Sequence, residues 1–109
     1  MPVVSNTSPI LNLAIIGKLS LLQGQFEAIW IPSAVIDELR IQEKLPGFSE
    51  IRMALEEGWL RVIDIKDKDK AKLLNRDLDR GESEAITLAL QVNCNFNNYF
   101  SQNPNNKIA

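Results

Sequence analysis

Apolar residues follow two patterns along residues 1–92: short continuous runs and longer stretches with helical spacing. The short runs are Val3-Val4, residues 27–31 and residues 59–65, and they predict three buried strands. Stretches with apolar residues three and four positions apart fall between these runs and predict helices. Because helices separate the strands, the pattern predicts an α/β fold with a central parallel sheet and right-handed crossovers.

The predicted helices carry start and stop signals. Ser8 is predicted to cap the first helix, with Pro9 as its first residue and Gly17 at its end. Asp79 and Glu82 have the spacing of a capping box ahead of the last helix. The predicted helices are residues 8–17, 19–22, 33–40 and 49–57, then one opened by the charged run 64–70 with inner residues Ala71, Leu73, Leu74 and Leu78, and one over 80–92 with buried residues Ala85, Ile86, Leu88, Ala89, Leu90 and Val92.

The composition changes abruptly after Val92. Residues 93–109 contain seven asparagines, and neither a strand period nor a helix period is maintained there. Such a segment cannot bury enough apolar surface to support a packed structure. The prediction is therefore one incomplete domain over residues 1–92 and an Asn-rich, disordered or aberrant tail over residues 93–109.

Charge and composition narrow the chemistry. The formal net charge is −2, with 12 basic and 14 acidic residues, which argues against binding nucleic acid by a basic surface alone. A bound divalent metal would reverse the charge locally. The chain has no histidine, which excludes histidine zinc sites and Ser-His-Asp hydrolysis, so hydrolysis would depend on carboxylates and a metal.

The single cysteine and the absence of a membrane signal indicate the compartment. Cys94 has no partner for an internal disulfide, which indicates a reducing environment. No stretch approaches the ~18–20 apolar residues of a membrane span, and the N-terminus lacks the pattern of a signal peptide. The sequence predicts a cytoplasmic protein with no membrane partner.

Polar residues follow the predicted strands at three places. They are residues 6–8 (Asn-Thr-Ser), residues 37–38 (Asp-Glu) and residues 82–84 (Glu-Ser-Glu). In a parallel sheet functional groups gather at the carboxyl ends of the strands, so these segments are expected to converge. Oxygen ligands of this kind suit Mg²⁺ or Mn²⁺, which can activate water and stabilise charge on a phosphate.

Each candidate also has a purely structural interpretation. Asn6 and Ser8 could satisfy helix-end amides, Glu38 could be a solvated helix residue, and Glu82 could only cap its helix. On a helical wheel Glu82 falls on the apolar stripe of the last helix, whereas Glu84 lies on the flank of that stripe. Either glutamate could face a cleft.

Three motifs together carry a family resemblance. They are residues 3–10 (Val-Val-Ser-Asn-Thr-Ser-Pro-Ile), 31–39 (Ile-Pro-Ser-Ala-Val-Ile-Asp-Glu-Leu) and 78–89 (Leu-Asp-Arg-Gly-Glu-Ser-Glu-Ala-Ile-Thr-Leu-Ala). In this order, residues 1 to about 92 resemble the PIN domain superfamily, and more narrowly a prokaryotic PIN-like branch described as a domain of unknown function. The resemblance implies a three-layer α/β/α fold and a metal-dependent endoribonuclease, often the toxin of a toxin–antitoxin pair.

The resemblance also implies site residues. The superfamily's first acidic position falls on Asn6, whose amide oxygen can ligate Mg²⁺ but brings no charge. The second falls on Glu38 and the third on Glu84, with Glu82 as an acceptable substitute. Ser8 matches a small hydroxyl residue that supports the site. The resemblance thus implies that Asn6, Glu38 and Glu84 are catalytic and hold Mg²⁺ or Mn²⁺.

The last feature of the family pattern, an apolar strand ending in aspartates, is missing. No aspartate or glutamate follows Glu84. We hypothesise that a frameshift or early stop replaced the natural C-terminus, so that the last strand and helix are missing or degenerate. The expected function is therefore either an RNA-cleaving enzyme or an inactive PIN-like remnant that binds only proteins, such as an antitoxin or a second subunit in a homodimer. A third interpretation is an ordinary α/β domain with no nucleic-acid role.

Overall fold

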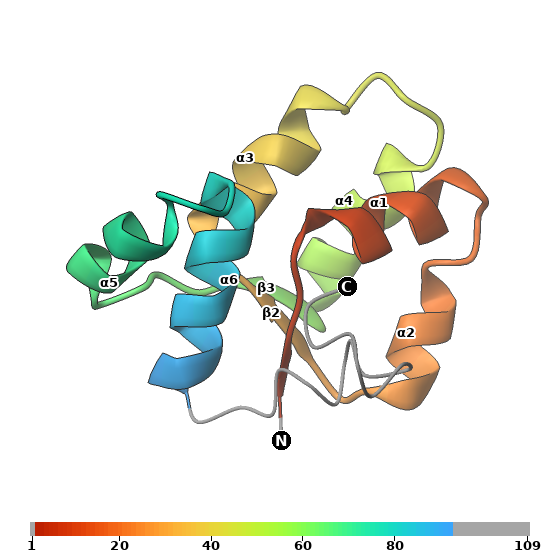
Figure 1. The fold of residues 1–109 in the computed structure, drawn as a ribbon. Helices are drawn as coiled ribbons and strands as arrows, with labels where there is room; N and C mark the ends of the chain where they lie inside the picture. The colour runs from red at the N-terminus through yellow and green to blue at the C-terminus, as the bar shows by residue number, and fades with distance from the viewer. Residues whose placement is uncertain (1, 93–109) are drawn as a thin grey trace, which may run out of the picture.

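The computed structural model of the protein describes residues 2–92. The predicted tail, residues 93–109 with Cys94, lies outside the described residues. The strands are β1 (Val3–Val4), β2 (Ile29–Ile31) and β3 (Leu60–Val62). The helices are α1 (Thr7–Ile15), α2 (Ser20–Gln25), α3 (Ser33–Ile41), α4 (Phe48–Glu57), α5 (Lys68–Leu74) and α6 (Arg80–Gln91). Figure 1 shows their arrangement along the chain.

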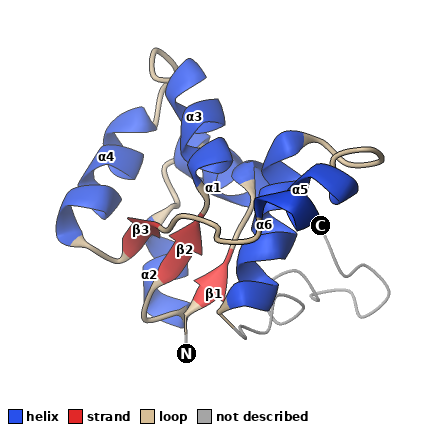
Figure 2. Cartoon of the chain, turned by 90° about the vertical axis from the view of Figure 1, so that its left-hand side faces the viewer, coloured by secondary structure: helices blue, strands red, loops and turns tan. Residues whose placement is uncertain are grey.

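Within residues 2–92, three parallel strands form one sheet in the order β1-β2-β3. The helices surround this sheet (Figure 2), and the predicted α/β class with a parallel sheet is confirmed. Because every strand runs the same way, their carboxyl ends share one edge of the sheet, where the polar segments after β1 and β2 begin.

The sheet is more exposed at β3, where Arg61 and Val62 reach solvent, than at β1. One row of register partners is Val3, Ile29 and Leu60, and the next row is Val4, Trp30 and Arg61. Successive residues of a strand point to opposite faces, so each row belongs to a different face. The first row is buried along its whole length, whereas the second becomes more exposed from β1 to β3.

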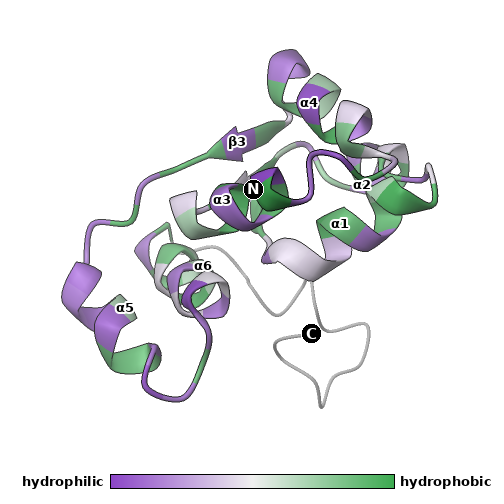
Figure 3. Cartoon of the chain, turned by 90° about the horizontal axis from the view of Figure 1, so that it is seen from above, coloured by the Kyte–Doolittle hydropathy of each residue, from purple (hydrophilic) through white to green (hydrophobic). Residues whose placement is uncertain are grey.

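Helices supply most of the core that positions the strands. α3 packs against α6 and α1, and α6 also packs against β1 and α5. Fully buried large side chains come from helices, strands and the loop before α2: Ile10, Leu19, Ile29, Ile31, Leu39, Ile51, Leu60 and Leu88. Hydrophilic and hydrophobic segments alternate along α4 and α5 (Figure 3), and the apolar Met53 and Leu73 on these helices are exposed. None of the helices within residues 2–92 is long and apolar enough to cross a membrane.

Three glycines, Gly17, Gly47 and Gly58, have positive φ, a backbone conformation that side chains rarely adopt, and two of them bound α4. Gly58 ends α4 with φ of 86°, as the sequence predicted. Gly47 precedes α4 with φ of 96°, and a Cβ there would overlap the backbone carbonyl of Ala14 in α1. The close packing of α1 on α4 therefore depends on a glycine at position 47.

Some predicted details were wrong. α1 begins at Thr7, so Ser8 lies inside the helix and is not its cap. The predicted inner residues Leu73 and Leu90 are 64% and 61% exposed. Helical spacing identifies an apolar stripe but not how much of it neighbouring helices cover. Of the predicted inner residues on α5, Ala71 is buried as expected.

Candidate functional site

A cavity of about 290 Å³ lies where the end of β1 meets α3 and the start of α6. It is lined by Asn6, Thr7, Ser8, Glu38, Asp79 and Glu82. None of these lining residues is basic, so the cavity offers carboxyl, hydroxyl and amide groups. Three segments far apart in the sequence meet here, and we call this space the oxygen cavity.

Asn6 is placed by the sheet. The backbone N–H of Ser5 donates to the carbonyl of Trp30, which continues the β1–β2 ladder up to the start of α1. Asn6 occupies the N-cap position of α1 and is 6% exposed, but its side chain makes no capping hydrogen bond. The structural alternative, in which the Asn6 side chain caps a helix, is therefore not what the structure shows. Thr7 and Ser8 follow in the first turn of α1.

Glu38 reaches the oxygen cavity from α3. The hydroxyl of Thr7 donates to Glu38 Oε2 at 3.1 Å. Gly81 in the first turn of α6 lies directly beneath the carboxylate, because a Cβ at this position would come within 2.9 Å of Oε2 and closer still to Oε1. Because Gly81 has no side chain, the Glu38 carboxylate has room to lie against the first turn of α6.

The pKa of Glu38 is raised above its ordinary value. Burial is the main cause, and the nearby charges of Asp79 and Glu84 raise the pKa further. The hydrogen bond from Thr7 and the charge of Arg80 lower it, and they offset only part of the rise. Negative charge at Glu38 is therefore poorly compensated by the protein's own groups.

Asp79 and Glu82 belong to the start of α6. The backbone N–H of Glu82 donates to Asp79 Oδ1 at 2.8 Å, so Asp79 caps α6 as predicted. Burial raises the pKa of Glu82, and so do the hydrogen bond with the Asp79 side chain and the charges of Asp79 and Glu38, while a backbone hydrogen bond with Asp79 lowers it. Helix capping thus holds a second carboxyl group in the cavity.

The donor set of the oxygen cavity fits a hard divalent cation. Carboxylate and amide oxygens are the ligands Mg²⁺ and Mn²⁺ prefer. A cation would stabilise the charged forms of Glu38 and Glu82, whose pKa values are raised mainly by burial and further by neighbouring acidic groups. Among the described residues, no three Asp, Glu, His or Cys side chains lie close enough to hold a metal by themselves. Mg²⁺ commonly keeps several waters and takes only one or two carboxylates, so Glu38, Glu82 and Asn6 suit a partly hydrated ion.

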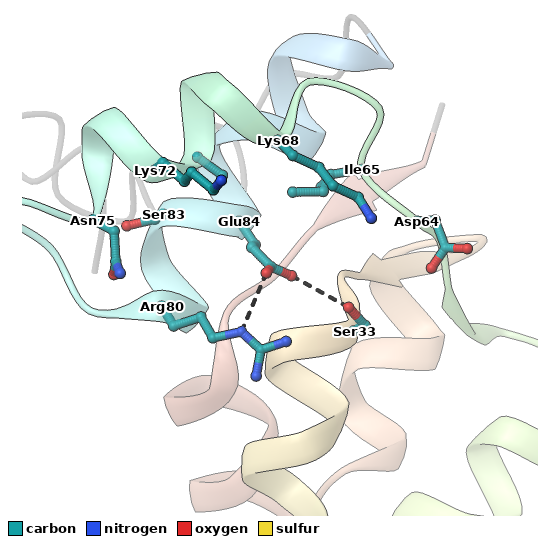
Figure 4. A pocket seen from close by; sticks show the side chains of 10 residues that line it. Ser33, Asp64, Ile65, Lys68, Lys72, Asn75, Arg80, Ser83 and Glu84 are labelled. Atoms are coloured by element: carbon teal, nitrogen blue, oxygen red, sulfur yellow. Dashed lines mark hydrogen bonds and ion pairs between the residues drawn. The ribbon is translucent and has the colours of Figure 1, made fainter.

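Glu84 lines a different space, a cavity of about 530 Å³ between α5, α6 and the start of α3. Its Oε1 accepts hydrogen bonds from the backbone N–H of Ala34 at 3.1 Å and from the Ser33 hydroxyl at 3.4 Å. Its Oε2 accepts from Arg80 Nε at 3.3 Å (Figure 4). The structure therefore brings Asn6, Ser8, Glu38 and Glu82 together and places the predicted third ligand, Glu84, next to them, where it caps α3.

Sequence reasoning included Thr7 in the polar segment 6–8 without giving it a role, and it missed the roles of Arg80 and Gly81. Arg80 also contacts Asp37 at 3.4 Å, and both side chains of that ion pair are more than half exposed. The four-residue spacing of Arg80 and Glu84 within a helix was an available signal for their ion pair. A glycine near the start of a helix, where no turn requires it, was a signal for close approach of another group.

Comparison with known protein families identifies the family to which the chain is similar. A family model described as PIN domain matches residues 2–96, which is most of the chain. The match extends from before β1 to beyond α6, so it includes all the residues that line the two cavities. No curated protein and no solved structure matches the chain.

Proposed function

Because the chain belongs to the PIN domain family, whose function is nuclease-like in general, we propose that it is a metal-dependent endoribonuclease that hydrolyses phosphodiester bonds of RNA. One observation carries the proposal. The oxygen cavity collects Asn6, Glu38 and Glu82 from three distant segments, and no basic side chain lines it. This is the donor chemistry that a nuclease using Mg²⁺ or Mn²⁺ requires.

The proposed roles follow from the contacts. Glu38, Glu82 and the amide oxygen of Asn6 would hold the ion, which when bound supplies an activated water and stabilises charge on the phosphate. Thr7 orients Glu38 through its hydroxyl, and Asp79 holds Glu82 at the start of α6. An amide in place of a carboxylate at position 6 predicts weak metal binding, which favours assays at millimolar Mn²⁺.

Three isosteric variants test the proposal. Structured RNA is incubated with Mn²⁺ and the wild-type chain or the Glu38→Gln, Glu82→Gln or Glu84→Gln variant. Glutamine keeps a hydrogen-bond acceptor but removes the charge. We expect Glu38→Gln and Glu82→Gln to lower the cleavage rate by about 100-fold, and Glu84→Gln by only a few-fold, because Glu84 caps α3.

The exposed Glu56→Gln on α4 is the matched control and should cleave like the wild type. Loss of cleavage in Glu84→Gln but not in Glu82→Gln would make Glu84 the third acidic residue. Cleavage that survives the Glu38→Gln change, or that does not need a metal, would reject the proposal.

The second candidate function is a non-catalytic PIN domain that only binds proteins, such as an antitoxin or a second copy of the chain. The observation that favours it is the absence of any aspartate or glutamate among residues 85–109. It predicts no cleavage by the wild-type chain, a folded circular dichroism spectrum, and a complex with the product of a neighbouring gene. A toxin role of an active enzyme would instead require cleavage that this partner suppresses.

A further inference from the structure

We propose that the second cavity, between α5, α6 and the start of α3, binds a backbone phosphate of the RNA strand beside the one to be cleaved. This inference rests on the proposed function and names the part of the substrate that the neighbouring cavity recognises. The ligand chemistry is a phosphodiester of single-stranded RNA. The charges around the cavity, the partners of Glu84 and the position of α6 support this assignment.

The two cavities have opposite charge character. Three basic side chains, Lys68, Lys72 and Arg80, line the second cavity together with two carboxylates, Asp64 and Glu84. The lining of the oxygen cavity contains three acidic residues and no basic one. One phosphate of an RNA strand can bind in the positively charged cavity, while the neighbouring phosphate lies beside a cation held in the negatively charged cavity.

One of the two carboxylates, Glu84, is already engaged. Glu84 accepts hydrogen bonds from Ser33, Ala34 and Arg80, and its side chain is only 13% exposed. Its charge is therefore largely offset by these groups and by the amino end of α3. An incoming anion would meet the basic side chains without strong competition from Glu84.

Lys68 and Lys72 are the basic side chains of this cavity whose charge is not used in an ion pair within residues 2–92. They lie four residues apart on α5, so they share one face of that helix, and both are exposed. Figure 4 shows both side chains over the cavity. Within residues 2–92 neither lysine takes part in an ion pair, so each can pair with a phosphate at little cost.

The walls of the cavity are held in place. Gln91 of α6 accepts from the backbone N–H of Lys66 at 2.6 Å and donates to the carbonyl of Asp64 at 3.0 Å. These two bonds tie the segment before α5 to the end of α6. The lysines are thus presented by a fixed element, which lowers the entropy cost of binding.

The first turns of α6 face both cavities. Asp79 and Glu82 line the oxygen cavity, whereas Arg80 and Glu84 line the second. Residues two positions apart in a helix differ by ~3 Å along its axis and by ~200° around it, so the two cavities lie on different sides of the first turns of α6. They are still close, because the charges of Arg80 and Glu84 in the second cavity act on Glu38 in the oxygen cavity. An RNA strand that passes around the amino end of α6 would place neighbouring backbone phosphates in the two cavities.

Binding without cleavage tests the phosphate site. Anisotropy of a labelled single-stranded RNA is followed with the full chain in EDTA, over a series of salt concentrations. For the Lys68→Gln/Lys72→Gln double variant we expect roughly fivefold weaker binding near 0.1 M salt. The slope of log affinity against log salt should flatten by about 0.7 for each phosphate that the variant no longer neutralises.

Two matched variants control for charge and for fold. Lys18→Gln/Lys44→Gln removes the same charge from residues outside this cavity and should bind like the wild type. Lys68→Arg/Lys72→Arg should keep wild-type affinity. Equal weakening in both glutamine variants, unchanged binding in both, or no RNA binding by the wild type would each overturn the phosphate site. Release of RNA by inorganic phosphate at an equal phosphate concentration would assign the site to free phosphate and overturn the strand proposal.

The nuclease proposal is tested separately by cleavage with Mn²⁺. RNA binding that depends on the two lysines, without cleavage by the wild type, would reject the nuclease and leave the phosphate site standing. Cleavage that is unchanged in the lysine variants at subsaturating RNA would reject the phosphate site and leave the nuclease standing.

Discussion

Replacing Gly81 by alanine should disturb the oxygen cavity while leaving the fold intact. The added Cβ would lie within 2.9 Å of Glu38 Oε2 and closer to Oε1. Because the carboxylate is the end of a flexible side chain, it will move and the helix backbone will stay. Moving it breaks the hydrogen bond from Thr7, which is 3.1 Å long. The expected defect is therefore a displaced Glu38 in an otherwise intact protein.

The contributions to stability nearly cancel. Alanine in place of a helical glycine stabilises by about 0.5–1 kcal/mol. Loss of the Thr7–Glu38 hydrogen bond costs about 1 kcal/mol, since the pair is only partly buried. The free energy of unfolding should change by less than about 1 kcal/mol. Displacing a ligand that its neighbours hold in place lowers metal affinity by about 10–100-fold.

The assay is Mn²⁺ binding by calorimetry, together with urea unfolding of the same samples. Gly24→Ala is the matched control, because Gly24 lies in α2 and a Cβ there meets nothing within 4 Å. The control should gain stability and bind Mn²⁺ like the wild type. If Gly81→Ala also binds Mn²⁺ with wild-type affinity, the placement of Glu38 over Gly81 does not matter for the metal and the reasoning is wrong.

Three further predictions concern stability. The pKa of Glu38 is raised in the folded protein, so its contribution to the free energy of unfolding is fully present below the unfolded pKa of about 4.3 and is lost as pH rises through the folded pKa. In urea unfolding, the stability of Glu38→Gln should therefore depend less on pH than that of the wild type and should not be lower at pH 7. A clearly lower stability of the variant at pH 7 would contradict the raised pKa. Asp79→Ala should lower the free energy of unfolding by about 1 kcal/mol through loss of the α6 cap, whereas Asp79→Asn should retain most of it, and equal values would show that the cap is not responsible. Gly47→Ala should lower the free energy of unfolding by about 2 kcal/mol or more, because position 47 has a positive φ and its Cβ would overlap the Ala14 carbonyl. Gly58→Ala should lower it by only about 1 kcal/mol, because position 58 has a positive φ but open space around it. The reverse order would contradict the close approach of Gly47 to Ala14.

The sequence predicted the class and order of elements because the apolar runs and helix signals are local. Strand β1, the helix after Pro32, the end of α4 at Gly58 and the Asp79 cap all appear where their residues indicate. The limits of β2 and β3 were not predictable, since a strand ends where its partner ends. The exposure of Leu73 and Leu90 depends on which neighbours cover each helix, which helical spacing does not contain.

The candidate site was predictable only in part. Convergence of residues 6, 38 and 82 follows from parallel strands and from the helical wheel of α6. The motif resemblance pointed to Glu84 as the third acidic residue, but this carboxylate meets the backbone N–H of Ala34, a tertiary contact 50 residues away. Which of two nearby glutamates turns toward which neighbour depends on the packing of α3 on α6, and no local pattern encodes it.

Both cavities are closed by contacts between parts of the chain that are synthesised far apart in time. The hydrogen bond of Thr7 with Glu38 spans 31 positions, and that of Ser33 with Glu84 spans 51. Such contacts form only after the intervening loops have closed. While the polypeptide is still growing on the ribosome, a chain that has not yet released α6 has neither cavity. Whatever binds in either cavity would therefore find no site on a partly synthesised chain.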